Sequence, residues 1–124
     1  MTDKPRVLHV GDDRDFSSML QQALAEAVEF VPVPDLHEAA AQLKAQRFDL
    51  IVLDIATGES GLALLAAMDN MTPVLMLAAS EPNTEVKEKV TACLVKSRQS
   101  ETRIIEKILD MVSAEGKQDH ARSS

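Results

Sequence analysis

Three acids and one lysine stand in this sequence where they could carry out chemistry together. Asp12 and Asp13 follow the first apolar run, Asp54 follows a central one, and Lys96 follows a late one. Carboxylates suit a hard divalent cation such as Mg²⁺, which takes oxygen ligands and keeps several waters. A carboxylate that attacks phosphorus gives an acyl phosphate, and a lysine can balance the charge of a phosphoryl group. These residue types together predict a site for metal-assisted phosphoryl chemistry.

The central run, residues 48–54, is the best candidate for a strand that positions such a site. It is apolar without alternation from Leu50 to Leu53, which is typical of a parallel strand covered on both faces. Ligands collect beyond the carboxyl ends of the strands in an open parallel sheet, so Asp54 is a candidate functional acid. Position alone leaves a second interpretation open, in which Asp54 caps the loop or helix that follows.

Length, composition and charge limit the classes of protein to which the chain can belong. A length of 124 residues indicates a single domain. The net charge of -7 argues against a surface for phosphate backbones or anionic lipid, because both need a basic patch. We therefore expect binding to neither nucleic acid nor membranes. Cys93 is the only cysteine, which excludes an internal disulfide, and the lack of a signal peptide or apolar span predicts a cytoplasmic protein.

The rest of the chain alternates apolar runs with amphipathic stretches. We expect strands over 6–10, 30–33, 48–54, 74–78 and 92–95, and helices over 13–27, 35–46, 61–69, 82–89 and 99–113. Five strands alternating with five helices predict an α/β fold, a doubly wound five-stranded parallel sheet with helices on both faces. Residues 1–114 would form this domain and residues 115–124 a disordered tail.

Single residues add detail to this pattern. Pro32 cannot donate to a strand ladder, which places its strand at the edge of the sheet. Asp13 and Asp35 precede helical stretches and are expected to be N-caps. His9 lies within the first apolar run, and we expect it to be a buried histidine with one hydrogen bond.

The order and spacing of these pieces resemble the receiver domain of two-component response regulators over about residues 5–114. Residues 7–13 resemble that family's first strand and acidic cluster, and residues 50–54 its phosphoacceptor strand. Residues 73–79 are similar to its fourth strand, and residues 94–96 to its lysine strand. The resemblance implies the flavodoxin-like strand order 2-1-3-4-5, which sets the first and third strands side by side.

The resemblance also implies roles for individual residues. Asp54 would accept a phosphoryl group from a histidine kinase or phosphotransfer protein, and Lys96 would contact the phosphoryl oxygens. Mg²⁺ would be held by Asp12, Asp54 and the backbone carbonyl of Ala56. Such a domain is a signalling protein rather than an enzyme, with at most self-phosphorylation and self-dephosphorylation.

The sequence departs from the family at several positions. Where the family has the first acid of a pair, this chain has Gly11, so Mg²⁺ would bind weakly. Asp13 either replaces that carboxylate as a metal ligand or serves only as a helix cap. Ala78 stands at the usual Ser or Thr and Cys93 at the usual aromatic switch, and the fourth helix is short.

The sequence is therefore compatible with three functions. The first is an atypical stand-alone receiver that is phosphorylated on Asp54, and the second is a degenerate receiver-like module that binds a partner without phosphorylation. The third is a flavodoxin-like flavin protein. The acids after the first strand would repel a flavin phosphate, and the chain has no tryptophan or tyrosine to stack on the ring. The residues favour the first hypothesis.

Overall fold

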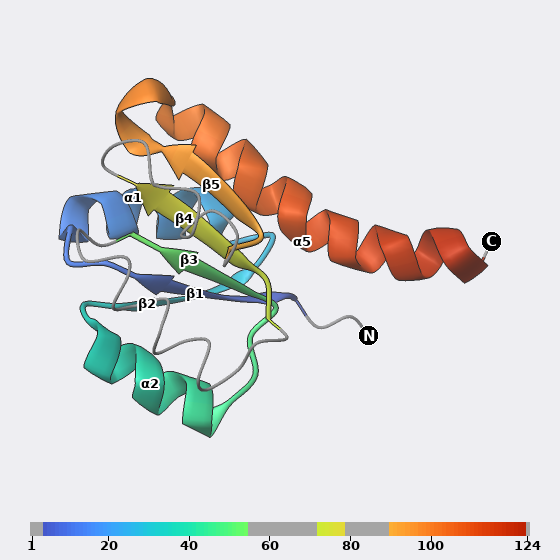
Figure 1. The fold of residues 1–124 in the computed structure, drawn as a ribbon, viewed down its shortest axis with the longest axis horizontal. Coiled ribbons are helices and arrows are strands. Elements are labelled where there is room, and N and C mark those ends of the chain that lie inside the picture. Colours follow the sequence, from blue (N-terminus) through green and yellow to red (C-terminus); the bar gives the residue numbers. More distant parts are fainter. Residues whose placement is uncertain (1–3, 55–71, 79–89, 124) are drawn as a thin grey trace.

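The computed structural model describes residues 4–54, 72–78 and 90–123. In this part of the chain five strands form one parallel sheet in the order β2-β1-β3-β4-β5, which confirms the predicted fold class and strand order (Figure 1). The strands are β1 (Arg6–Val10), β2 (Glu29–Val33), β3 (Leu50–Leu53), β4 (Val74–Ala78) and β5 (Ala92–Val95).

The unbroken apolar runs form the inner strands, as their composition predicts. Every residue of β3 and every residue of β4 is buried, because a parallel strand with helices on both faces has no solvent side. The edge strand β2 carries Pro32, which is exposed and pairs with His9 of β1. The missing N–H of Pro32 is tolerated there because an edge strand has one unpaired side.

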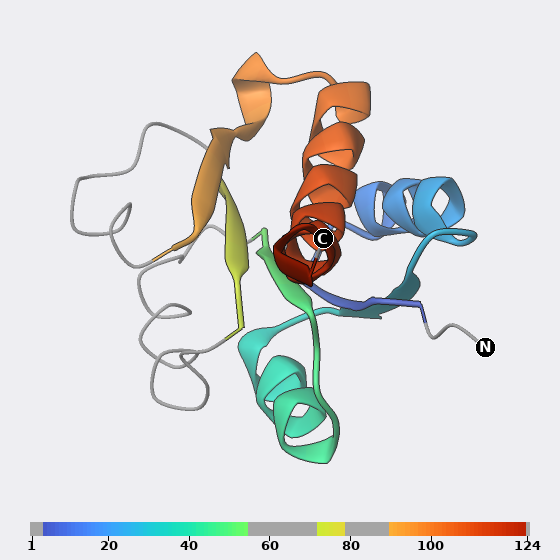
Figure 2. The ribbon, with the colours of Figure 1, turned by 90° about the vertical axis from the view of Figure 1, so that its right-hand side faces the viewer.

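Helices cover both faces of the sheet (Figure 2). Helices α1 (Arg14–Leu24) and α5 (Glu101–Ser123) pack on one face, where Phe16, Leu20 and Ile108 join Val52 in a buried core. Helix α2 (Leu36–Ala45) packs on the other face through Ala39. Each helix presents one apolar stripe to the sheet, so the described residues form the doubly wound arrangement that the alternating pattern predicts.

The helix N-caps fix where α1 and α2 begin. The Asp13 carboxylate accepts a hydrogen bond from the Phe16 N–H at 3.1 Å, and that of Asp35 accepts one from the Glu38 N–H at 2.9 Å. Both contacts satisfy donors that have no partner within the helix, and both predicted caps are confirmed.

Helix α1 ends earlier than its apolar stripe predicts. It stops at Leu24 rather than at Ala27, and the Leu24 carbonyl accepts hydrogen bonds from the N–H groups of Ala27 and Val28 at 3.0 and 2.9 Å. The chain must turn here, because the N–H of Glu29 already bonds to the Pro5 carbonyl at 2.8 Å at the start of β2. Pairing of the strand therefore sets the end of the helix.

Helix α5 ends later than predicted. It begins at Glu101 and continues to Ser123, past the expected end at Ser113, and its last part extends beyond the sheet (Figure 1). An apolar stripe indicates which part of a helix packs against the core, and on α5 that part includes Ile104, Ile108 and Val112. It does not indicate where the backbone hydrogen bonds of the helix end. The division into a domain of residues 1–114 and a tail of residues 115–124 stays a prediction.

Two predicted helices, over 61–69 and over 82–89, lie outside the described residues, and so does the predicted shortening of the fourth helix. Between β5 and α5 the chain forms one short 3₁₀ turn, η1 (Lys96–Arg98). None of the helices in the described ranges is long and apolar enough to cross a membrane.

Burial along α5 predicts a difference between two isoleucines of the same helix. Ile108 is fully buried in the core, whereas Ile105 is only partly buried against it. We expect Ile108→Ala to lower the free energy of unfolding by roughly 2–5 kcal/mol, because it leaves a cavity, and Ile105→Ala to lower it by about half as much. Urea unfolding of both variants checks this, and equal losses would contradict the packing of α5.

Candidate functional site

The carboxyl ends of β1 and β3 bring the acidic residues to one edge of the sheet. The two strands are neighbours, with Val10 paired to Leu53, and the N–H of Asp54 donates to the Val10 carbonyl at 2.8 Å. This hydrogen bond fixes the position of the Asp54 backbone next to the end of β1. Asp12 and Asp13 follow β1 at the same edge of the sheet. This is the position at which open α/β sheets bind ligands.

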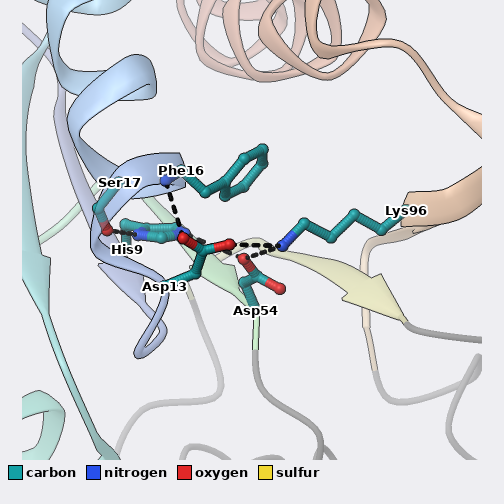
Figure 3. Close-up of polar contacts among 6 residues, drawn as sticks. All are labelled: His9, Asp13, Phe16, Ser17, Asp54 and Lys96. Atoms are coloured by element: carbon teal, nitrogen blue, oxygen red, sulfur yellow. Dashed lines mark hydrogen bonds and ion pairs between the residues drawn. The ribbon is translucent and has the colours of Figure 1, made fainter.

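A lysine from the far side of the sheet contacts the Asp54 carboxylate. Lys96, the first residue of η1, donates from Nζ to Asp54 Oδ2 at 3.0 Å. Strand β4 lies between β3 and β5, so the side chain of Lys96 extends across β4 to reach the acid (Figure 3). The Asp54 side chain is only 9% exposed. The predicted acid and lysine are thus brought together.

The amine of Lys96 has two further neighbours from α1. Nζ lies 4.0 Å from the centre of the Phe16 ring and 4.0 Å from Asp13 Oδ2. The ring face attracts the cation, and the second carboxylate adds to that attraction. Phe16 lies in the first turn of α1 and Asp13 is its N-cap, so the start of this helix helps to hold Lys96 over Asp54.

The Asp13 side chain serves as the N-cap of α1. Its Oδ1 accepts the hydrogen bond from the N–H of Phe16, while its Oδ2 faces Lys96. The helix-cap interpretation of Asp13 is therefore confirmed. Its alternative role as a replacement metal ligand stays a prediction.

The donor set suits a cation that is bound through few protein oxygens. Asp12 is exposed, two residues beyond the end of β1, and Asp54 follows the neighbouring strand. Mg²⁺ often binds through one or two carboxylates and keeps its other waters, and this pair of acids fits that chemistry. The Ala56 carbonyl lies outside the described residues, and no group of three or more His, Cys, Asp or Glu side chains that could hold a metal gathers in the described ranges.

Sequence reasoning missed the contact of His9 with this site. The expected burial and single hydrogen bond are found, with Nδ1 of His9 2.8 Å from the Ser17 hydroxyl. The other nitrogen, Nε2, lies 3.7 Å from Asp54 Oδ2 (Figure 3). The available signal was a polar residue inside an apolar strand, one position before that strand's last residue.

The glycine that replaces the family's first acid is tightly enclosed. A Cβ atom on Gly11 would lie 2.7 Å from the backbone carbonyl oxygen of Asp54 and 3.3 Å from Cε1 of His9. Such an approach to backbone is not sterically possible without movement of the strands. The space that a side chain at this position would need is therefore filled by Asp54 itself and by the His9 ring.

The electrostatic environment of Asp54 favours its ionised form. Burial raises the pKa of Asp54, but the nearby His9 ring together with the hydrogen bond and the positive charge of Lys96 outweigh that cost. The pKa of Asp54 consequently lies below its ordinary value. The acid is thus available as a carboxylate nucleophile at neutral pH.

The two positions that lack the family's switch residues lie on β4 and β5. Ala78 is buried at the end of β4 and pairs with Val95. Cys93 pairs with Met76 and packs, partly buried, against the core on the α2 face. At the positions that the sequence resemblance compares with a receiver's switch residues, Ala78 therefore offers no hydroxyl and Cys93 no aromatic ring.

Comparison with known proteins identifies this fold. No protein-family profile and no curated protein matches the sequence, whereas many solved structures match the fold. A receiver domain of a Francisella response regulator shares 23% identity with a TM-score of 0.77, over 89% of this chain and 98% of that one. The Vibrio cholerae chemotaxis protein CheY4 shares 26% identity with a TM-score of 0.71, over 87% and 98% of the two chains.

A third match was solved in complex with a ligand. The Thermotoga maritima response regulator TrrA, in complex with Mg²⁺-BeF, shares 23% identity with a TM-score of 0.72, over 86% of this chain and 98% of that one. The parallel sheet in the order β2-β1-β3-β4-β5, with helices on its faces, defines a flavodoxin-like α/β domain. Within that class, the chain has the fold of a response regulator receiver domain.

The enclosure of Gly11 predicts that even one added methyl group is harmful. We expect Gly11→Ala to lower the free energy of unfolding by about 1–3 kcal/mol, because β1 and β3 must separate to admit the new Cβ. Thermal or urea unfolding measures the loss. A matched control is Ser18→Ala, which also introduces alanine but at an exposed position of α1. Equal stability of the two variants would contradict the close approach of Gly11 to Asp54.

The lowered pKa of Asp54 predicts a pH-dependent part of the stability. The carboxylate is stabilised in the fold, so its contribution is present above the unfolded value of 3.8 and is lost as the pH falls through the folded value. We expect the difference in unfolding free energy between wild type and Asp54→Asn to shrink below about pH 4. Urea unfolding at a series of pH values checks this, and a difference that grows on acidification would contradict it.

Proposed function

We propose that this chain is a phosphorylatable receiver and that Asp54 is its phosphoacceptor. The observation that carries the proposal is the contact of Lys96 Nζ with Asp54 Oδ2 at 3.0 Å, at the carboxyl edge of a receiver-like sheet. A carboxylate at this edge, kept ionised and paired with a movable cation, is what nucleophilic attack on a phosphoryl group requires.

The chemistry assigns a role to each residue. The ionised Asp54 attacks the phosphorus of a donor, and Lys96 follows the charge that moves onto the phosphoryl oxygens. Asp12 and Asp54 would hold Mg²⁺, with Ala56 as a further ligand, and Asp13 would contribute only if its cap were released. When bound, Mg²⁺ offsets the repulsion between the two anions as they approach each other.

The partners of such a site follow from its chemistry. The phosphoryl donor would be a histidine kinase or a phosphotransfer protein, as in two-component signalling. The chain would act as a cytoplasmic signalling intermediate rather than as an enzyme with its own substrate, and the acidic net charge of -7 argues against nucleic-acid or membrane binding.

A second candidate function has its own support. Gly11 has no room for a side chain, and Ala78 has no hydroxyl, so a receiver-like module that binds a partner without phosphorylation is the alternative. The flavin-binding alternative gains nothing from the described residues, since the 340 Å³ depression beside Lys96 is lined by the acids Asp13, Asp15 and Glu101.

Phosphorylation of a single residue tests the proposal directly. With saturating Mg²⁺ and acetyl phosphate, we expect the intact mass of the wild-type protein to rise by one phosphoryl group. Asp54→Asn should gain none, because it lacks the nucleophile, and Lys96→Ala should gain roughly a tenth of the wild-type amount or less, because it lacks the compensating charge.

The matched control is Asp49→Asn, which changes the same residue type at the opposite end of β3 and should be phosphorylated like the wild type. An adduct that persists in Asp54→Asn would place the acceptor elsewhere. No adduct on the wild type would favour the interaction module instead.

A further inference from the structure

His9 is a buried polar residue that the proposed function leaves unused. Its side chain has no exposed surface, and its ring is held between Phe16 and Phe30, with ring centres 5.9 and 5.6 Å away. Among the described residues, its Nε2 is a buried side-chain nitrogen without a hydrogen-bond partner. A buried nitrogen in this condition calls for an explanation, because leaving it unpaired is costly.

The direction in which His9 Nε2 points supplies an explanation for its burial. Nε2 faces Asp54 Oδ2 at 3.7 Å, on the opposite ring edge from the contact of Nδ1 with the Ser17 hydroxyl at 2.8 Å (Figure 3). A lone pair on Nε2 would repel the carboxylate, so the hydrogen belongs on Nε2. In the neutral ring Nδ1 then accepts, and Ser17 donates to it. Ser17 thereby fixes the tautomer that points a donor at Asp54.

Two donors therefore face the same oxygen of the phosphoacceptor. Lys96 Nζ and His9 Nε2 both face Oδ2, which leaves Oδ1 as the oxygen that neither of them engages. The contact of His9 Nε2 with Oδ2, at 3.7 Å, is longer than a hydrogen bond, whereas that of Lys96 Nζ, at 3.0 Å, is one. The two sides of Asp54 are thus chemically different.

We propose that His9, oriented by Ser17, is a positioning residue that directs phosphorylation to Oδ1 of Asp54 and shortens the lifetime of the acyl phosphate. The inference rests on the proposed phosphoacceptor function. A Cβ on Gly11 would lie 3.3 Å from Cε1 of His9, so the ring that faces Asp54 takes up part of the space that a side chain at position 11 would need.

The effect on lifetime follows from where charge develops. In hydrolysis a water oxygen attacks phosphorus, the P–Oδ1 bond breaks with its electron pair moving to the carboxylate, and both hydrogens of the water leave with the phosphate. The departing carboxylate shares its negative charge over Oδ1 and Oδ2. A donor at Oδ2 stabilises that carboxylate more than it stabilises the acyl phosphate, so it favours release of the phosphoryl group.

Two amide substitutions separate this role from a merely structural one. The nitrogen of glutamine reaches the place of the imidazole Nε2, whereas that of asparagine reaches only the place of Nδ1. We expect His9→Asn to lose phosphate about tenfold more slowly than the wild type, because it lacks a donor at Oδ2. His9→Gln should restore release to within about threefold of the wild type.

The experiment loads each protein with acetyl phosphate and Mg²⁺, removes the donor, and follows the decay of the phosphorylated mass with time. Far-UV circular dichroism of each variant reports whether it is folded. An adduct that decays equally fast in His9→Asn and His9→Gln overturns the inference about His9 but leaves the proposed function intact. No adduct on the wild type overturns the proposed function, and this inference with it.

Ser17 provides a second test that leaves the buried ring in place. Ser17→Ala removes the donor to Nδ1 and frees the tautomer, so its acyl phosphate should decay several-fold more slowly than that of the control Ser18→Ala at the exposed neighbouring position. If neither amide variant folds, the comparison of Ser17→Ala with Ser18→Ala decides. Equal lifetimes of the acyl phosphate in these two variants overturn the inference. In long-range ¹H–¹⁵N spectra of the wild type, a His9 proton on Nδ1 instead of Nε2 would also overturn it.

Discussion

Parallel pairing of all the strands is the constraint on which the site depends. Because β1, β3, β4 and β5 run in one direction, the residues that follow them gather at one edge, although they are far apart along the chain. The order of the strands places β3 at the centre, covered on both faces by apolar side chains. Asp54 is consequently held at the boundary between a dry core and the open edge of the sheet, and its carboxylate is mostly shielded from water.

A carboxylate in this position is stable only if donors replace the water it has lost. Lys96, which directly follows β5, and His9 of β1 both face the same oxygen, Oδ2. The arrangement joins both halves of the sheet through one charged group, and the Phe16 ring on α1 supports each of the two donors. The chemistry that we propose for Asp54 and the packing of the α1 face therefore share their residues.

Departures from the receiver pattern acquire physical reasons in the structure. Gly11 is required because its backbone lies against that of Asp54 and against the His9 ring. Gly11 and His9 therefore constrain each other, because a Cβ on Gly11 would lie 3.3 Å from Cε1 of the ring. Ala78, by contrast, belongs to the buried core on the α2 face and Cys93 packs against it, and neither contributes a hydroxyl or a large ring. Asp54 and Lys96 therefore meet at the edge of the sheet, and the residues around them include Gly11 and His9.

The sequence by itself determined the fold class, the edge position of Pro32, the N-caps Asp13 and Asp35, and the meeting of Asp54 with Lys96. Each of these follows from local patterns, such as periodicity, caps and strand ends, together with a general rule of parallel sheets. Tertiary structure decided the ends of α1 and α5, the enclosure of Gly11 and the approach of His9 to Asp54. These features depend on the register between strands and on the space between their side chains, and contacts between residues distant in sequence set both.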